Sequence, residues 1–333
     1  MLLVFLSALA GAIILTGLVR RYALNRSVLD VPNARSSHTV PTPRGGGLSI
    51  ILVLPLVIGA GWWWGWFEIR VVLGLSVGVL LLSVVGFVDD HRPLSARLRF
   101  SLQGLSAFFG LLLLPGLPSL PMGNWQLSPF IVLPLLWLAL VWLTNLYNFM
   151  DGIDGLATLE AISVLAGGAL LLALAGVDQW QFLVLLCAPM IGFLCWNFPP
   201  AKIFMGDVCS APLGLLLGML GIWLAAETDL NLWCWLILLS VFIVDATWTL
   251  IARMLSGQRW AEAHRSHAYQ ILSRRWGSHR TVTLGVVLVN IVWLWPWAAL
   301  AYFHPAWALL CWLLAAIPLA AVCYRVGAGH INH

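Results

Sequence analysis

Eleven long apolar runs divide this 333-residue chain and leave it few ways to fold. A helix rises about 1.5 Å per residue, so about 17–20 apolar residues cross the hydrocarbon core of a bilayer. Lipid offers the backbone no hydrogen bonds, and such runs therefore fold as helices. The runs lie near residues 2–19, 46–64, 71–88, 100–114, 130–148, 156–175, 180–197, 211–226, 232–252, 282–302 and 306–324.

The sequence therefore predicts an all-α fold, a polytopic membrane helix bundle in one integral-membrane domain, 1–333. Hydrophobic residues make up 61% of the chain, against roughly 45–50% in soluble domains. We expect about eleven transmembrane helices. The number falls to ten if one of the two shortest runs, 100–114 and 211–226, does not span the membrane.

The basic residues are divided unevenly between the loops that join these runs. Sixteen of the 17 Lys and Arg residues follow the first, third, seventh, ninth and eleventh runs, and only Arg70 lies on the other side. Cytoplasmic loops carry the excess of Lys and Arg, so we expect a periplasmic N-terminus and a cytoplasmic C-terminus. The net charge of +4 suits anionic lipid head groups and phosphates, and it does not indicate a nucleic-acid partner.

The segment NLYNFMDGIDGLA, residues 145–157, concentrates polar groups in a chain of which only 9% is charged. A step of three residues turns a helix about 60° away from alignment, so one straight helix cannot point four such side chains at one site. We therefore expect the helix to break near Gly152, where the backbone is flexible. The polar groups, spaced three residues apart, are Asn145, Asn148, Asp151 and Asp154.

A second acidic pair ends the third apolar run, in GFVDDHRP. Pro93 keeps Arg92 out of the helical region, so Asp89 and Asp90 occupy the last turn. The macrodipole is negative there, and each carboxylate costs about 0.3–1 kcal/mol. A cationic group should offset this cost, either Arg92, Arg97 and Arg99 in a structural ion-pair network or a divalent cation. Carboxylate and amide oxygens, together with phosphate, suit Mg²⁺ or Mn²⁺.

The loop at residues 29–50 contains three prolines and three consecutive glycines, so it cannot form a regular helix. It is either a plain connector or a lid over an anionic ligand. In the second case Arg35, His38 and Arg44 are the expected phosphate or head-group contacts.

The loop NFPPAKIFMGD, residues 197–207, leaves a similar choice. Asp207 is either the N-cap of the next helix, a common and stabilising role for aspartate, or a metal ligand. In the second case Lys202 is a candidate phosphate contact.

Asp245 lies deep in the ninth run, on the same helical face as Thr249 and Arg253. A charge about 12 Å inside the end of a membrane helix costs about 2.5–3.5 kcal/mol and needs a partner in the bundle interior. Its role is structural or site-lining.

The basic segment that follows carries HRSHAYQ, residues 264–270. Its spacing is not HExxH, so nucleotide or phosphate contacts are favoured over a zinc site.

Together these motifs resemble the polyprenyl-phosphate N-acetylhexosamine-1-phosphate transferase superfamily. The matching pieces run in family order from about residue 30 to 280, and NxxNxxDGxDGL with FMGD is the most specific combination. They are PTPRGGG (41–47), GFVDD (86–90), NLYNFMDGIDGLA (145–157), NFPPAKIFMGD (197–207) and HRSHAYQ (264–270).

The resemblance implies a phosphotransferase in the bacterial inner membrane with its active site on the cytoplasmic face. Such an enzyme moves N-acetylhexosamine 1-phosphate from a UDP-N-acetylhexosamine to undecaprenyl phosphate, giving polyprenyl-diphosphate-sugar and UMP. It implies dependence on Mg²⁺, with Mn²⁺ as the alternative ion. Its partners are the two substrates and the lipid bilayer, and we leave open a homodimer.

The resemblance also assigns residues. Asp207 is expected to be the principal Mg²⁺ ligand, with Asp154 as a second ligand. Asp89 and Asp90 would deprotonate or position the lipid phosphate. The expected substrate contacts are Asn145, Asn148, Asp151, Asp154, Lys202, His264, Arg265, His267, Arg44 and His38.

Two departures favour one branch of the superfamily. The lysine that follows the acidic pair in muramoyl-pentapeptide enzymes is replaced by the sequence of His91, Arg92 and Pro93, and the histidine loop lacks three consecutive histidines. Both favour the branch that starts O-antigen or other surface glycans, with N-acetylfucosamine, N-acetylquinovosamine or N-acetylglucosamine as the sugar. The alternatives are a muramoyl-pentapeptide phosphotransferase, an isoprenoid prenyltransferase and, outside enzymes, a membrane transporter.

Overall fold

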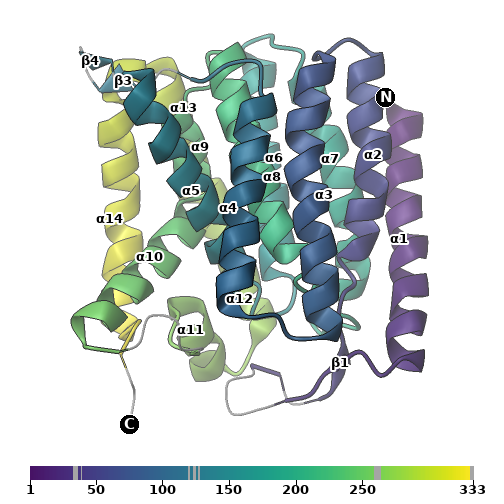
Figure 1. Ribbon diagram of the computed structural model, residues 1–333. Helices are drawn as coiled ribbons and strands as arrows, with labels where there is room; N and C mark the ends of the chain where they lie inside the picture. Colours follow the sequence, from purple (N-terminus) through teal and green to yellow (C-terminus); the bar gives the residue numbers. More distant parts are fainter. Residues whose placement is uncertain are drawn as a thin grey trace.

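A computed structural model describes residues 1–32, 37–38, 40–118, 121–122, 125–126, 128–258 and 264–330. In this part of the chain the protein is a bundle of helices with four two-residue strands (Figure 1). The all-α prediction is therefore confirmed. The first elements are α1 (Leu2–Asn25), β1 (Leu29–Asp30), β2 (Thr42–Pro43), α2 (Leu48–Trp63), α3 (Ile69–His91), α4 (Ala96–Leu113), β3 (Pro121–Met122), β4 (Trp125–Gln126), α5 (Pro129–Met150) and α6 (Leu156–Leu174). The remainder are α7 (Trp180–Asn197), α8 (Ser210–Glu227), α9 (Leu232–Leu238), α10 (Ser240–Leu255), α11 (Ala268–Trp276), α12 (His279–Val289), the π-helix η1 (Asn290–Leu294), α13 (Trp295–Phe303), the 3₁₀ turn η2 (Pro305–Trp307) and α14 (Ala308–Val326).

Each of the eleven apolar runs forms helix, but not every run forms one helix long enough to span. Among the described residues, eight helices are long and apolar enough to cross a membrane, and nine if α9 and α10 count as one bent span. Helix α2 has only 16 residues, and α4 begins with two arginines in its first turn. The chain is thus a multi-pass membrane protein, while the count of ten or eleven spans stays a prediction.

The ninth run is not one straight helix. Helices α9 and α10 meet at an angle of 76°, with Leu239 in a non-helical conformation between them. The run contains neither glycine nor proline, the usual causes of a sharp bend, so no local pattern predicts this bend. Helix α10 leans away from the other helices toward α14 (Figure 1).

Helix α8 forms the centre of the bundle. In its most apolar stretch 78% of the residues are buried, against 17% in α1 at the edge. Helices α3 and α5 pack against α8, and α7 packs between α6 and α1. Several helices begin at side chains that accept a backbone N–H, as capping requires; these are Ser95 for α4, Asn231 for α9 and Ser278 for α12.

The two ends of the bundle differ. The lower end in Figure 1 holds β1, α11 and the start of α12, and the short strands β3 and β4 lie at the upper end. The start of α1 and the end of α14 lie toward opposite ends of the bundle. The periplasmic N-terminus and the cytoplasmic C-terminus stay a prediction. We call the lower end the carboxylate end, because α3 and α5 finish there and α8 begins there, which brings Asp90, Asp151 and Asp207 together.

Candidate functional site

The acidic pair of α3 meets the start of α8 at the carboxylate end. Helix α3 ends at His91 and Arg92 is extended, as Pro93 predicted. The Asp90 carboxylate accepts the backbone N–H of Asp207 and of Val208, each at 3.1 Å. The negative end of α3 thus faces N–H groups that lead into α8, which offsets the unfavourable placement of the pair.

Two arginines neutralise the same pair. Arg99 Nη1 lies 2.7 Å from Asp89 Oδ2 and 3.8 Å from Asp207 Oδ2. The Arg44 guanidinium donates to the backbone carbonyl of Asp90, and its Nε lies 3.8 Å from Asp90 Oδ1. Of the three arginines expected in an ion-pair network, Arg99 is confirmed, and Arg44 joins it from the proline- and glycine-rich loop. A divalent cation stays a prediction.

Asp207 is held by side chains and does not cap a helix. Asn148 Nδ2 donates to its Oδ1 at 2.6 Å and to Ser210 Oγ at 2.9 Å. The N-cap of α8 is Cys209, so the N-cap interpretation of Asp207 is wrong. Burial, a hydrogen bond with Asp89 and the charge of Asp90 raise the pKa of Asp207 to about 7. A nearby cation would lower that pKa.

The helix that carries the polar residues ends where their spacing predicted, near Gly152. Helix α5 ends at Met150, and α6 begins at Leu156 after Gly155, whose φ is +71°. Asp151, directly after α5, faces the acidic group: burial and the charges of Asp207 and Asp90 raise its pKa well above the usual value.

The Asp154 carboxylate contacts a histidine and a backbone N–H from other segments. Its Oδ1 lies 3.2 Å from His279 Nδ1, and its Oδ2 accepts the N–H of Ala201 at 3.0 Å. The two carboxylates of the segment therefore have different neighbours.

Two glycines allow the backbones at this site to touch. A Cβ atom on Gly86, in GFVDD, would lie 2.0 Å from the carbonyl oxygen of Asp207. Gly206, in FMGD, has a φ of +80° and would carry a Cβ 2.6 Å from Asp90 Oδ2. Only glycine fits such close contact and such a backbone conformation. The glycines of both motifs thus bring α3 against the loop that carries Asp207.

The proline- and glycine-rich loop is hydrogen-bonded to the FMGD segment that precedes α8. Strands β1 and β2 pair within it. Gly46 and Gly47 donate to the carbonyls of Phe204 and Met205, each at 2.9 Å. The loop therefore fixes the FMGD segment as well as delivering Arg44, which a plain connector would not do. Its role as a lid over a ligand stays a prediction.

Asp245 organises the histidine loop from inside the bundle. Its carboxylate accepts the N–H of Ala268 at 2.9 Å and of Tyr269 at 3.0 Å, and His267 Nδ1 lies 3.4 Å away. Tyr269 Oη in turn donates to the Phe149 carbonyl at 2.8 Å, close to the break after α5. Asp245 is therefore structural: it anchors the start of α11 and so positions the histidine loop.

Comparison with known proteins supports the grouping of these motifs. A family model described as glycosyl transferase family 4 matches residues 72–225. A protein of Bacillus subtilis (strain 168), named "Probable undecaprenyl-phosphate N-acetylglucosaminyl 1-phosphate transferase", is 32% identical over 312 residues, which cover 86% of this chain and 81% of that protein. The chain belongs to glycosyl transferase family 4.

Other family 4 relatives match a shorter part of the chain. Two phospho-N-acetylmuramoyl-pentapeptide-transferases, from Streptococcus pyogenes serotype M18 (strain MGAS8232) and Streptococcus equi subsp. zooepidemicus (strain MGCS10565), are 31% and 30% identical over 229 and 223 residues. The matches cover 62% of this chain and 65% of each relative, just under two thirds. The resemblance to the polyprenyl-phosphate transferase superfamily is confirmed, and the chain is a membrane transferase rather than a transporter.

Some expected contact residues of this family 4 chain have other neighbours. Asn145 donates to Gln103 Oε1 and to the Val141 carbonyl, each at 2.7 Å. Lys202 Nζ lies 5.7 Å from the centroid of the Trp196 ring. His38 Nε2 lies 3.3 Å from the Asp30 carbonyl. Their roles as substrate contacts stay predictions.

In the histidine loop, the rings of His264 and His267 lie 4.9 Å apart. Burial and the nearby charges of His267 and Arg253 lower the pKa of His264 to about 3, so that ring is neutral. The Arg265 carbonyl accepts a hydrogen bond from Arg274. Arg35, another expected contact, lies outside the described residues.

Two contacts between helices complete the site. Arg99, one of the three arginines expected to pair with the acidic residues, bridges Asp89 and Asp207 from the start of α4. His279 reaches Asp154 from α12, and no local pattern pointed to this contact. Both contacts form between helices, where sequence spacing carries no information.

The donor set fits a divalent cation only in part. Within the described ranges, no group of three His, Cys, Asp or Glu residues is arranged to hold a metal ion. The charge of Asp207 nevertheless raises the pKa of Asp151, so the two carboxylates lie near each other. Mg²⁺ binds through one or two carboxylates, with water and phosphate as its other ligands, so these two oxygen donors fit. Asp154 has His279 and Ala201 on its carboxylate, and its role as a second ligand stays a prediction.

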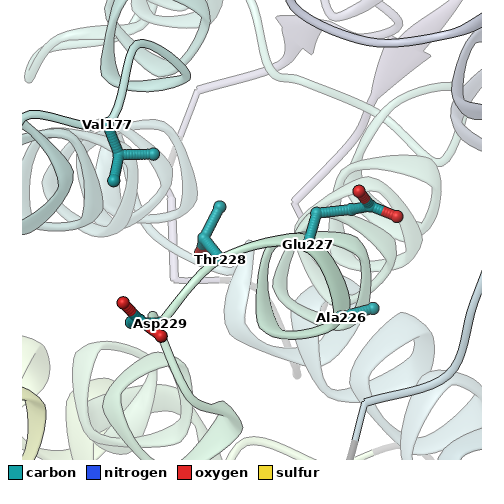
Figure 2. A pocket seen from close by; sticks show the side chains of 5 residues that line it. All are labelled: Val177, Ala226, Glu227, Thr228 and Asp229. Carbon is teal, nitrogen blue, oxygen red and sulfur yellow. The ribbon is translucent and has the colours of Figure 1, made fainter.

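A depression at the other end of α8 carries no comparable chemistry. It is lined by Val177, Ala226, Glu227, Thr228 and Asp229. Figure 2 shows the carboxylates of Glu227 and Asp229 pointing to opposite sides of the chain. Because the two carboxylates do not converge, we do not assign a second site here. Substitutions at this depression serve as controls for substitutions at the carboxylate end.

Proposed function

We propose that this chain transfers N-acetylhexosamine 1-phosphate from a UDP-sugar to undecaprenyl phosphate, giving polyprenyl-diphosphate-sugar and UMP. The observation that carries the proposal is the meeting of Asp207 with Asp151, Asp89 and Arg99 at the carboxylate end. The printed name of the Bacillus subtilis relative supports the lipid acceptor and the sugar phosphate.

The reaction exchanges one phosphoanhydride bond for another. An oxygen of the lipid phosphate forms a bond to the phosphorus that carries the sugar. The bond from that phosphorus to the bridging diphosphate oxygen breaks, and UMP leaves with the electron pair. The acceptor phosphate is already an anion near neutral pH, so the protein mainly has to position two anions and offset their repulsion.

A divalent cation, when bound, would supply charge stabilisation for the diphosphate and the leaving UMP. Asp207 and Asp151 are the residues that would hold it. Arg44 and Arg99 lie on either side of the acidic group and add positive charge that phosphate oxygens can contact.

Asp89 and Asp90 are better suited to positioning than to proton transfer. Both Asp90 oxygens accept backbone N–H groups, and Asp89 accepts the N–H of Leu94 and pairs with Arg99. These contacts favour direct attack by the lipid phosphate over a route through a phosphorylated aspartate.

The sugar and the pathway are proposed from two departures in the sequence. The departures at residues 91–93 and in the histidine loop favour N-acetylglucosamine, N-acetylfucosamine or N-acetylquinovosamine, for O-antigen or a related surface glycan. The runner-up is the muramoyl-pentapeptide substrate of the streptococcal relatives. The position of sixteen of 17 basic residues supports an inner-membrane enzyme with a cytoplasmic site, and a homodimer stays a prediction.

We expect purified protein to release UMP from a UDP-N-acetylhexosamine only when undecaprenyl phosphate and Mg²⁺ are both present. Chelation of the metal should reduce the rate at least about 100-fold, because a cation supplies several kcal/mol of charge stabilisation. A panel of UDP-sugars in the same assay identifies the donor. A folded sample that releases no UMP from any of them would refute the proposed function.

A further inference from the structure

His279 begins α12 and contacts segments that are distant from it in the sequence. Its Nε2 lies 3.0 Å from the backbone carbonyl oxygen of Ser37. Its Nδ1 lies 3.2 Å from Asp154 Oδ1 and 3.5 Å from the Asp154 backbone nitrogen. Both side chains are mostly buried, with exposed fractions of 18% for His279 and 12% for Asp154.

The chemistry of the two acceptors defines how the ring binds. A carbonyl oxygen only accepts, so Nε2 carries the hydrogen that binds Ser37. Nδ1 faces a carboxylate oxygen, and a second N–H there makes a charge-assisted hydrogen bond. One ring thus joins the loop that holds Ser37 and residues 40–47 to the turn after α5.

Asp154 extends this connection in two more directions. Its Oδ2 accepts the N–H of Ala201 at 3.0 Å, in the loop before FMGD. Its backbone carbonyl accepts Thr283 Oγ1 at 2.9 Å, one turn further along α12. Four segments therefore meet at the His279–Asp154 pair: the loop that holds Ser37 and residues 40–47, the turn at 151–155, the loop at 198–209, and α12.

Three of these segments carry groups of the proposed site. The first delivers Arg44 to Asp90, the second carries Asp151, and the third carries Asp207. Neither His279 nor Asp154 is itself among the groups that meet at Asp207.

We propose that His279 is a positioning residue: through Asp154 and Ser37 it holds these three segments so that Arg44, Asp151 and Asp207 face one another. This rests on the proposed function for its effect on turnover, although the contacts themselves do not depend on it. Asp154 then serves the site by fixing the turn that carries Asp151.

The test compares His279→Gln and Asp154→Asn with their double variant. The matched control is His304→Gln, because His304 is an exposed histidine after α13 that stacks on Trp307. We expect kcat per folded molecule to fall about 10- to 100-fold in each variant, since a displacement near 1 Å at reacting groups has an effect of that size. The KM for undecaprenyl phosphate should change little, and the double variant should lose no more than the worse single variant.

Hydrogen exchange measured by mass spectrometry gives a readout that needs no activity. His279→Gln should speed exchange about tenfold at residues 151–156 and 40–47, while α9 and α13 remain unchanged. Wild-type exchange at these segments, strictly multiplicative losses in the double variant, or lower thermal stability with unchanged kcat would each overturn the proposal. If wild-type protein releases no UMP, the proposed function fails, and the exchange measurement still decides whether His279 holds the segments.

Discussion

Asp207→Asn should lower turnover at least about 10³-fold while the bundle stays folded. Loss of a carboxylate that holds a divalent cation removes several kcal/mol of charge stabilisation, and each 1.36 kcal/mol is a factor of ten in rate. Asparagine keeps an oxygen that can accept the hydrogen bond from Asn148 Nδ2, so the local fold should persist. The measurement is UMP release at saturating substrates, with thermal unfolding to confirm the fold.

The control for this variant is Asp229→Asn. Asp229 follows the other end of α8, about 27 Å away along an 18-residue helix, and lines the depression in Figure 2. It should keep wild-type turnover. Wild-type activity in Asp207→Asn would remove Asp207 from the metal site, and equal losses in both variants would show a general effect of removing acidic groups.

Gly86→Ala should impair both stability and turnover, although it adds only one methyl group. The added Cβ would lie 2.0 Å from the Asp207 carbonyl oxygen and 2.6 Å from the Val208 nitrogen. Because backbone atoms cannot swing aside as a side chain does, α3 must move away from the loop of Asp207. Overpacking of this kind costs about 1–3 kcal/mol or more, and the displacement should lower turnover about 100-fold.

Gly59→Ala is the matched change for that experiment. Gly59 lies within α2. Apart from its chain neighbours and the backbone of its own helix, no atom of the described residues lies within 4 Å of the Cβ that alanine would place there. Alanine there should stabilise the helix by up to about 1 kcal/mol. Thermal unfolding and turnover of the two variants are compared side by side. Equal melting temperatures and equal rates would contradict the close contact between Gly86 and the Asp207 backbone.

Local rules predicted the parts of the site that depend on neighbours in sequence. Pro93 located the end of α3 and so placed Asp89 and Asp90 in its last turn. The three-residue spacing required the break that the structure has between Met150 and Leu156. The misplaced carboxylates also predicted a cationic partner, which the structure provides as Arg99 and Arg44.

Local rules could not predict contacts between residues that are distant in the sequence. Asp245 accepts N–H groups that lie 23 and 24 residues further along the chain, and only the packing of α11 against α10 reveals its structural role. His279 lies 125 residues from Asp154.

Asp207 shows how a correct local rule can fail. Aspartate before a helix is usually its cap, but Asn148 and Arg99 approach this one from other helices. Cys209 takes the N-cap position of α8 instead.

The fate of the sugar-linked phosphorus decides between sugar-phosphate transfer and transfer of the sugar alone. Purified protein is incubated with undecaprenyl phosphate, Mg²⁺ and a UDP-N-acetylhexosamine that is labelled at the phosphorus bearing the sugar. We predict that the label moves into the lipid fraction and that the released UMP is unlabelled, with the transfer lost in Asp207→Asn. Label that remains in water-soluble UDP while the sugar enters the lipid would contradict the proposed reaction.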